Sequence, residues 1–225
     1  MANLNGKIVL ITGAKGGLGT SVTTAFLEAG AQVIGVSRSI QASDFKHSRF
    51  TALPAELSSG DAARQVVAEA VAQFGRIDAL VHVMGGFAGG LSVADTDDAT
   101  MDKMFELNFR AAFHVLRATI PQMRAQGSGR IIAVASRQGV EPAAMLGAYS
   151  ASKAALVSLM KTVALENKDA GITANAVLPG GMATPNNRGA GLIPTGLVAS
   201  VIAYLAGDEA SAVTGAAIPV YGTQL

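Results

Sequence analysis

Apolar residues in this chain fall into short runs separated by longer amphipathic stretches. The short apolar runs predict strands at 7–12, 31–36, 49–54, 77–83, 129–135, 172–178 and 216–220. Stretches with helical spacing lie near 18–29, 61–74, 97–125, 148–168 and 195–206. Near-continuous apolar strands are typical of parallel sheets covered by helices on both faces. The alternation predicts an α/β fold: a single-domain, Rossmann-type, doubly wound parallel sheet.

Composition narrows the class of protein further. Half of the 225 residues are hydrophobic and 15% are charged, and no repeat, linker or low-complexity segment interrupts the chain. No apolar run approaches the roughly 20 residues that a membrane-spanning helix needs. The first residues, MANLNGKIVLITG, contain a strand-sized apolar run and no charged leader. We therefore expect residues 1–225 to form one cytoplasmic dinucleotide-binding and catalytic domain that does not bind a membrane.

Cysteine, histidine and net charge exclude several kinds of chemistry. The chain has no cysteine, so disulfides, thiolate metal sites and cysteine nucleophiles are excluded. His47, His82 and His114 are far apart in sequence, so we expect no metal site. The net charge is +1 and no basic block is present, which argues against a nucleic-acid partner. A small molecule is the expected substrate.

The first strand ends in a glycine-rich turn, TGAKGGLG at 12–19, which leads into a helical pattern. Such a turn lets backbone N–H groups and a helix N-terminus meet a pyrophosphate. Gly13, Gly17 and Gly19 carry the spacing, and Leu18 lies between the last two. The turn resembles the cofactor turn of the short-chain dehydrogenase/reductase family, and the resemblance extends over nearly the whole chain.

The end of the second strand indicates which dinucleotide binds. An acid there would bind the ribose hydroxyls of NAD, whereas an arginine accommodates the 2′-phosphate of NADP. The chain has Ser37 and then Arg38, and Lys15 adds a second positive charge. The sequence therefore favours NADP(H) over NAD(H), which stays possible. By resemblance, Glu56 and Leu57 after the third strand would contact the adenine.

Four residues resemble the catalytic tetrad of the same family: Asn108, Ser136, Tyr149 and Lys153. Tyr149 and Lys153 stand four apart on a predicted helix and so share a face. A neighbouring ammonium would lower the pKa of the tyrosine and prepare it as a general acid or base. The resemblance implies that Ser136 orients the substrate oxygen, that Lys153 also binds the nicotinamide ribose, and that Asn108 holds a water of the proton relay.

Downstream motifs extend the resemblance. NAVLPGGMAT at 175–184 matches the family pattern in which Pro179, Gly180 and Thr184 would contact the nicotinamide end of the cofactor. The last strand ends in VYGT, where many relatives have VDGG, so any contact of that aspartate is missing. Matching helices form subunit interfaces in this family, which implies a homotetramer, with a dimer as the alternative.

The segment VHVMGGFAGG at 81–90 departs from the family pattern. Relatives usually have NNAG here, and both asparagines are absent, so His82 is expected to supply a structural hydrogen bond. Gly85 and Gly86 would let the backbone pass close to the cofactor. Phe87 either packs over the site as a lid or contacts the substrate.

Two short strings are similar to dihydropteridine reductases, a branch of the family. GGFAGG resembles their GGWAGG, and ATPNNR at 183–188 resembles their TPMNR. These likenesses make Phe87, Asn186 and Ser136 candidate substrate contacts. However, that branch lacks the serine that Ser136 supplies, and it uses mainly NADH.

The sequence thus predicts an NADP(H)-dependent oxidoreductase that reduces a carbonyl, or oxidises an alcohol, with Tyr149 as general acid or base. One alternative is reduction of a quinonoid pterin. Another is a regulator that binds NADP without turnover, although such proteins commonly lose the tyrosine or the lysine, and both are present here.

Overall fold

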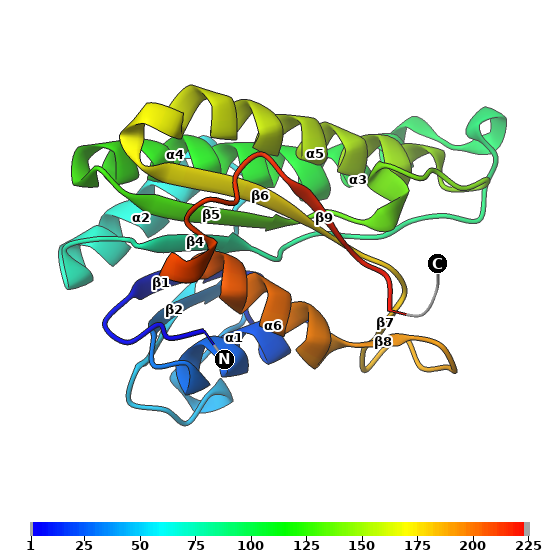
Figure 1. Cartoon of the computed structure of the whole chain (residues 1–225). Coiled ribbons are helices and arrows are strands. Elements are labelled where there is room, and N and C mark those ends of the chain that lie inside the picture. Colours follow the sequence, from blue (N-terminus) through cyan, green and yellow to red (C-terminus); the bar gives the residue numbers. More distant parts are fainter. Residues whose placement is uncertain (1, 223–225) are drawn as a thin grey trace.

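A seven-stranded parallel sheet forms the centre of the protein (Figure 1). The computed structural model describes residues 2–222. The strand order is β3-β2-β1-β4-β5-β6-β9, so the chain reverses its direction of travel between β1 and β4. The strands are β1 (Ile8–Thr12), β2 (Gln32–Ser37), β3 (Phe50–Pro54), β4 (Ala79–His82), β5 (Gly129–Val134), β6 (Ile172–Pro179) and β9 (Ala217–Val220). The doubly wound α/β fold expected from the sequence is confirmed.

Helices cover both faces of the sheet. They are α1 (Gly19–Glu28), α2 (Gly60–Phe74), α3 (Asp98–Phe105), α4 (Ala111–Gln126), α5 (Gly147–Asn167) and α6 (Thr195–Ala206). Figure 1 shows α4 and α5 on one side of the sheet and α1 and α6 on the other. Among the residues that the structure describes, no helix is both long and apolar enough to cross a membrane.

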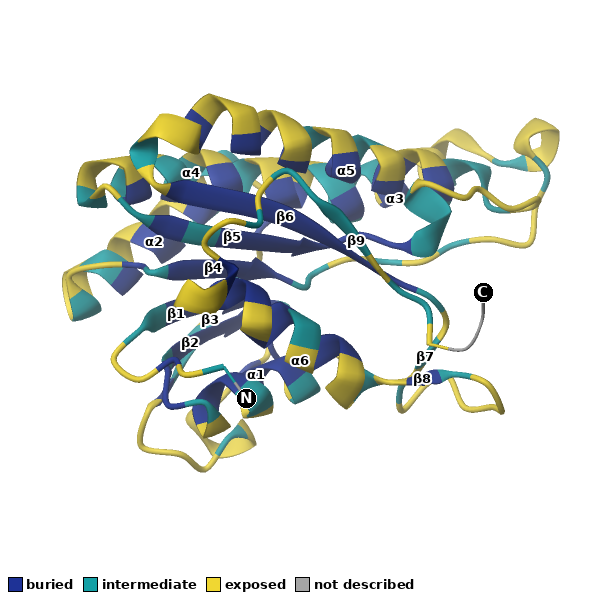
Figure 2. Ribbon diagram, viewed as in Figure 1, coloured by how far each residue is buried: buried dark blue, intermediate teal, exposed yellow. Residues whose placement is uncertain are grey.

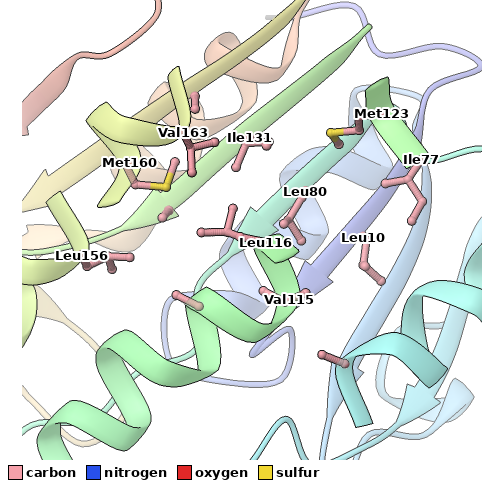
Figure 3. Close-up of a cluster of buried hydrophobic side chains, with 14 of the residues drawn as sticks. Leu10, Ile77, Leu80, Val115, Leu116, Met123, Ile131, Leu156, Met160 and Val163 are labelled. Carbon is pink, nitrogen blue, oxygen red and sulfur yellow. The ribbon is translucent and has the colours of Figure 1, made fainter. Parts of the chain in front are cut away.

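Two hydrophobic cores lie on opposite faces of the sheet, because successive side chains of a strand point to opposite sides. Leu10 of β1 joins the core beneath α2, α4 and α5, whereas its neighbours Val9 and Ile11 join the core beneath α1 and α6. Figure 3 shows the first core, where Leu116 and Met160 approach the sheet residues Leu80 and Ile131. The five inner strands β2, β1, β4, β5 and β6 are buried along most of their length, which explains their near-continuous apolar sequence. The edge strands β3 and β9 are mostly half-buried (Figure 2).

The helix expected at 97–125 is not one uninterrupted α-helix. A π-helical turn at Glu106–Arg110 separates α3 from α4. Single π turns inside α-helices are frequent at functional sites, and this one contains Asn108.

The segment after β6 forms a small parallel pair, β7 (Met182–Ala183) with β8 (Ile193–Pro194). Short 3-10 turns occur at Ala42–Asp44, Val93–Asp95, Arg137–Gly139, Lys168–Ala170 and Asp208–Ala210. The ending VYGT is described only to Gly222, and its last residue, Thr223, lies outside the described residues.

Candidate active site

The carboxyl ends of β1 and β4 meet where the order of the sheet reverses, and two adjoining cavities open there. The first has a volume of about 550 Å³ and lies over the glycine turn and the end of β2. The second has a volume of about 1100 Å³ and extends to α5 and the β7–β8 segment. Both are lined by Lys15, Gly17 and Leu18, so they form one elongated groove. Ligands of open α/β sheets bind at such a switch point.

The glycine turn of 12–19 is too tightly packed for side chains. A Cβ on Gly13, which has φ +73°, would lie 2.7 Å from the backbone nitrogen of Met84. A Cβ on Gly19 would collide with the Gly13 carbonyl, and one on Gly17 would lie 3.0 Å from Thr184 Cβ. No side chain caps the N-terminus of α1. The turn therefore offers an open backbone cradle and a helix N-terminus, features that fit a pyrophosphate.

Charged side chains surround the first cavity at the end of β2. The guanidinium of Arg38 lies 3.8 Å from the carboxylate of Glu56, and these side chains are 79% and 63% exposed. Lys15 pairs with Asp44 at 2.8 Å, and its backbone N–H donates to the Ser37 hydroxyl at 3.3 Å. Leu57 is buried and lines the same cavity. Arg38 is thus close to an acid, but both groups remain in water, where such pairs are weak.

Helix α5 places Tyr149 and Lys153 on the wall of the second cavity. Ser136 follows β5, is buried, and shares a hydrogen bond with the Tyr149 side chain. The Lys153 ammonium donates to the carbonyl of Val134, at the end of the same strand, over 3.0 Å. The structure thus brings together three of the four residues of the expected tetrad.

Burial controls the ionisation of these groups. It raises the pKa of Tyr149 above the ordinary value, although the hydrogen bond with Ser136 acts in the opposite direction. The same cause lowers the pKa of Lys153 to about 8. The expectation that Lys153 lowers the pKa of Tyr149 is therefore wrong for this structure, because desolvation of the phenol is the largest influence.

Asn108, the fourth member, acts through protein contacts. Its side-chain oxygen accepts from the Gly86 N–H at 2.8 Å, and its amide donates to the Gly86 carbonyl at 3.1 Å and to Ser152 Oγ at 3.0 Å. Ser152 in turn donates to the Tyr149 carbonyl at 2.7 Å. The amide therefore ties the loop after β4 to the catalytic helix, and its role in holding a relay water stays a prediction.

Three glycines in the segment after β4 lie so close to neighbouring residues that a side chain would not fit. A Cβ on Gly85 would lie 2.8 Å from Asn108 Oδ1 and 3.1 Å from Lys153 Nζ. One on Gly86 would lie 2.7 Å from Leu107, and one on Gly89 would collide with Leu146. The backbone is thus held close to the tetrad on one side and to the start of α5 on the other.

His82 supplies the structural hydrogen bond expected of it. Its Nδ1 lies 2.8 Å from Thr12 Oγ1, which joins the ends of β4 and β1. The ring is fully buried, and burial lowers the pKa of His82 to about 3. The imidazole is therefore neutral at physiological pH.

Phe87 lies at the mouth of the second cavity. Its ring meets the ring of Tyr149 edge-on, with centroids 5.0 Å apart, and the residue is 68% exposed. Thr184 and Asn186 line the same cavity, and Thr184 packs over the glycine turn. Neither Pro179 nor Gly180 is among the described residues that line the two cavities. A role for that pair stays a prediction.

Two residues near the tetrad were missed at the sequence level. Gln138 accepts a hydrogen bond from Ser136 Oγ to its Oε1 at 2.7 Å, and its place two positions after a strand-end serine is the one available signal. Arg188 lines the second cavity beside Asn186. Among residues 2–222 no group of three metal-ligating side chains occurs.

Comparisons with known proteins agree with this geometry. The family model for short chain dehydrogenases matches residues 7–191. The chain is 33% identical to the short-chain dehydrogenase/reductase olcF of Penicillium canescens, over 98% of this chain and 97% of that protein. It is also 33% identical to the uncharacterized oxidoreductase YvrD of Bacillus subtilis, over 97% and 96% of the two chains.

Solved structures give the same result. A short-chain dehydrogenase/reductase from Burkholderia xenovorans superposes with a TM-score of 0.92 and 29% identity, covering 100% of this chain and 98% of that one. A 3-ketoacyl-(acyl-carrier-protein) reductase from Brucella melitensis, complexed with NADH, has a TM-score of 0.89 and 27% identity, covering 98% of each chain. The cradle, the sheet and these matches together show that the chain is an oxidoreductase of the short-chain dehydrogenase/reductase family, whose members use NAD(P)(H).

Proposed function

We propose that residues 1–225 form one catalytic unit that reduces a carbonyl with NADPH, or oxidises the corresponding alcohol with NADP⁺. The observation that carries the proposal is that Tyr149 and Lys153 lie together on the wall of the second cavity, with Ser136 in contact with Tyr149. This cavity is continuous with the glycine cradle. The substrate is a small molecule that enters beside Phe87.

Each residue has a separate task in the reduction. When bound in the groove, NADPH would supply the hydride that reduces the carbonyl carbon. Tyr149 gives its hydroxyl proton to the carbonyl oxygen, which balances the charge that develops there. Ser136 donates a hydrogen bond to the same oxygen, and the Lys153 ammonium stabilises negative charge on the phenolate that is left. Asn108 keeps the tyrosine helix in place through Ser152.

Arg38 and Ser37 support a preference for NADP(H). Arg38 is an exposed cation at the rim of the first cavity, and a 2′-phosphate would replace Glu56 as its partner. Ser37 occupies the position where an acid would favour NAD(H). Lys15 also lines this cavity and adds positive charge. NAD(H) stays the alternative, since the structural relative from Brucella melitensis was solved with NADH.

The coenzyme preference is tested by comparing dissociation constants of NADPH and NADH in wild type and in Arg38→Leu. We expect the substitution to weaken NADPH about tenfold or more, as the loss of one charge-assisted contact predicts, and to leave NADH nearly unchanged. Glu56→Gln is the matched control, because it removes the competing acid and strengthens NADPH binding. Equal losses for both coenzymes in Arg38→Leu would contradict the NADP assignment.

A second candidate function is the reduction of a quinonoid dihydropterin. The edge contact of Phe87 with Tyr149 favours it, because an exposed aromatic ring beside the proton donor offers a surface for a flat heterocycle. Ser136 argues for a carbonyl substrate instead, since its hydroxyl, once turned away from Gln138, can donate to a carbonyl oxygen.

Initial rates of NADPH oxidation separate these functions. Wild type and Tyr149→Phe are compared with quinonoid dihydropterin and with a panel of ketones and aldehydes. A fast ketone rate that depends on Tyr149 supports the main proposal, and a fast pterin rate moves the second candidate ahead. Tight NADPH binding with no turnover in either assay would instead favour a non-catalytic NADP-binding regulator.

A further inference from the structure

We propose that Gln138 selects substrates that carry a hydroxyl or N–H donor on a carbon next to the reacting carbonyl. The proposal deepens the function proposed above and depends on it. Its starting point is the hydrogen bond from Ser136 Oγ to Gln138 Oε1, which is 2.7 Å long. Gln138 thus accepts the only hydrogen bond that the Ser136 hydroxyl could donate to a substrate.

The Ser136 hydroxyl is engaged by Gln138 in two ways. A serine hydroxyl has one proton and two lone pairs. The proton goes to Gln138 Oε1, and the Gln138 backbone N–H donates to Ser136 Oγ at 3.3 Å. In this structure the serine proton is therefore committed to Gln138.

A carbonyl substrate must break the hydrogen bond from Ser136 to Gln138. To bind the substrate oxygen, Ser136 has to turn its proton away from Gln138, and the carboxamide oxygen of Gln138 is then left without its donor. An unpaired and partly buried acceptor costs free energy. A substrate that brings its own donor to Gln138 removes this cost, whereas a plain ketone does not.

Distances restrict where that donor must be. Gln138 Oε1 lies 2.7 Å from Ser136 Oγ, and a bound carbonyl oxygen would lie about as far from the same atom. The two acceptors are therefore at most about 5.4 Å apart, the sum of two hydrogen-bond lengths. A hydroxyl on the carbon next to the carbonyl lies close enough to its own carbonyl oxygen to reach Gln138 over the remaining distance.

The surroundings of Gln138 favour a neutral donor. The neighbouring cation, Arg137, forms an ion pair with Glu141 at 2.7 Å, and its guanidinium lies 4.7 Å from the ring centroid of Tyr221. The charges of Arg137 and Glu141 therefore compensate each other, and neither is needed to bind a charged substrate group. A small cavity of about 280 Å³ lies beside Gln138, and all of its lining residues are uncharged.

The experiment uses two matched pairs of ketones that differ only in one hydroxyl: acetophenone with 2-hydroxyacetophenone, and cyclohexanone with 2-hydroxycyclohexanone. We measure kcat/KM with NADPH for wild type, Gln138→Met and Gln138→Glu. Wild type is expected to prefer the hydroxyketone about fivefold to tenfold, the factor that one neutral hydrogen bond supplies. Gln138→Met, which has similar volume and no acceptor oxygen, should lose this preference.

The two substrates of a pair should respond to Gln138→Met in opposite directions. The rate with the plain ketone should rise, because the Ser136 proton no longer has a competing acceptor, while the rate with the hydroxyketone falls. A loss of packing would lower both rates together. Gln138→Glu keeps an acceptor and should retain the preference, and the NADPH dissociation constant of each variant checks that the fold is intact.

Three outcomes would overturn the inference. An unchanged ratio of kcat/KM for hydroxyketone to kcat/KM for plain ketone in Gln138→Met would show that Gln138 does not bind the substrate hydroxyl. A wild type that prefers the plain ketones would do the same while leaving the proposed function in place. A wild type that turns over none of the four ketones would remove the proposed carbonyl reduction and the inference together.

Discussion

Tyr149 and Lys153 carry the acid–base chemistry, and burial shifts the pKa values of the two groups in opposite directions. The pKa of Tyr149 is raised by desolvation, so its phenol keeps its proton well into the alkaline range. The pKa of Lys153 is lowered to about 8 by the same cause. The charge on Lys153 is thus the first of the two to change as the pH rises.

Carbonyl reduction should therefore lose rate above about pH 8, where Lys153 gives up its proton. The protonated tyrosine is still present there, but the ammonium that stabilises the phenolate product is lost. We expect kcat/KM to fall by up to tenfold per pH unit on this limb. Initial rates at saturating NADPH are measured from pH 6 to 10, and the rate of Tyr149→Phe is subtracted as the background at each pH. A flat profile up to pH 10 would show that reduction does not need the charge.

His82 makes stability depend on pH at the acid end. Burial lowers the pKa of His82 from 6.5 to about 3 in the folded protein. Between about pH 6.5 and pH 3, His82 is therefore protonated in the unfolded chain but not in the folded chain. Its contribution is complete above pH 6.5 and is lost as the pH falls toward 3. The expected loss is about 1.4 kcal/mol per pH unit in this window.

Urea denaturation of wild type and His82→Asn from pH 5 to pH 7.5 measures this contribution. Asparagine keeps a hydrogen-bonding group for Thr12 and has no proton to take up. The difference in unfolding free energy between the two proteins should change with pH in the stated direction. Parallel curves would show that His82 does not titrate between the folded and unfolded states.

At the scale of elements, the glycine turn illustrates how a local sequence determines a binding surface. The third glycine, Gly19, is the first residue of α1 and touches the carbonyl of Gly13, so helix and strand meet with no room for a methyl group. Gly196 also lies in the first turn of a helix, α6, but a Cβ there would have no neighbour within 4 Å. The two positions form a matched pair.

Gly19→Ala should destabilise the protein by about 1–3 kcal/mol, the usual cost of overpacking, and weaken NADPH binding at least tenfold. Gly196→Ala should leave binding unchanged and be neutral or slightly stabilising, because alanine favours helix. Thermal unfolding and fluorescence titration with NADPH measure both effects. Normal NADPH binding by Gly19→Ala would mean that the turn is not the cofactor cradle.

The elements themselves were largely predictable, whereas their interruptions were not. Each of the seven sheet strands follows from an apolar run, and the runs are clearest in the five inner strands, where burial on both faces leaves few polar positions. The π turn at Glu106–Arg110 could not be found in this way, since the apolar spacing of 97–125 continues across it. The π turn contains Asn108, whose side chain donates hydrogen bonds to Gly86 and Ser152. Both partners are distant in sequence, so these bonds could not be predicted from the local pattern.

The same limit applies to the site as a whole. The residues Ser136, Tyr149 and Lys153 were predicted from their resemblance to the catalytic residues of the family, and the fold places them together. The contact of Ser136 with Gln138 and the cluster of Arg137, Glu141 and Tyr221 were not predicted. They depend on side-chain directions, and Tyr221 reaches Arg137 from the far end of the chain. Hydrophobic periodicity contains no information about such contacts.

At the scale of the whole molecule, large apolar side chains are exposed on both α4 and α5, and a row of aromatic rings runs from α3 into α4. The rings of Phe105, Phe109 and Phe113 follow one another with centroid separations of 6.5 Å and 6.3 Å. Phe113 is 40% exposed, and Leu165 on α5 is 73% exposed. Members of this family are typically oligomeric, and large exposed apolar residues on neighbouring helices are typical of a subunit interface.

We therefore expect the protein to be a homo-oligomer, a tetramer or else a dimer of the 22.7 kDa chain. Leu165→Lys should lower the assembly mass measured by light scattering, because it places a charge in an interface that excludes water. Val93→Lys is the control, since Val93 is 79% exposed but lies on the loop after β4. A monomeric wild type, or an equal effect of both variants, would contradict an interface on α4 and α5, and these apolar residues would then simply face water.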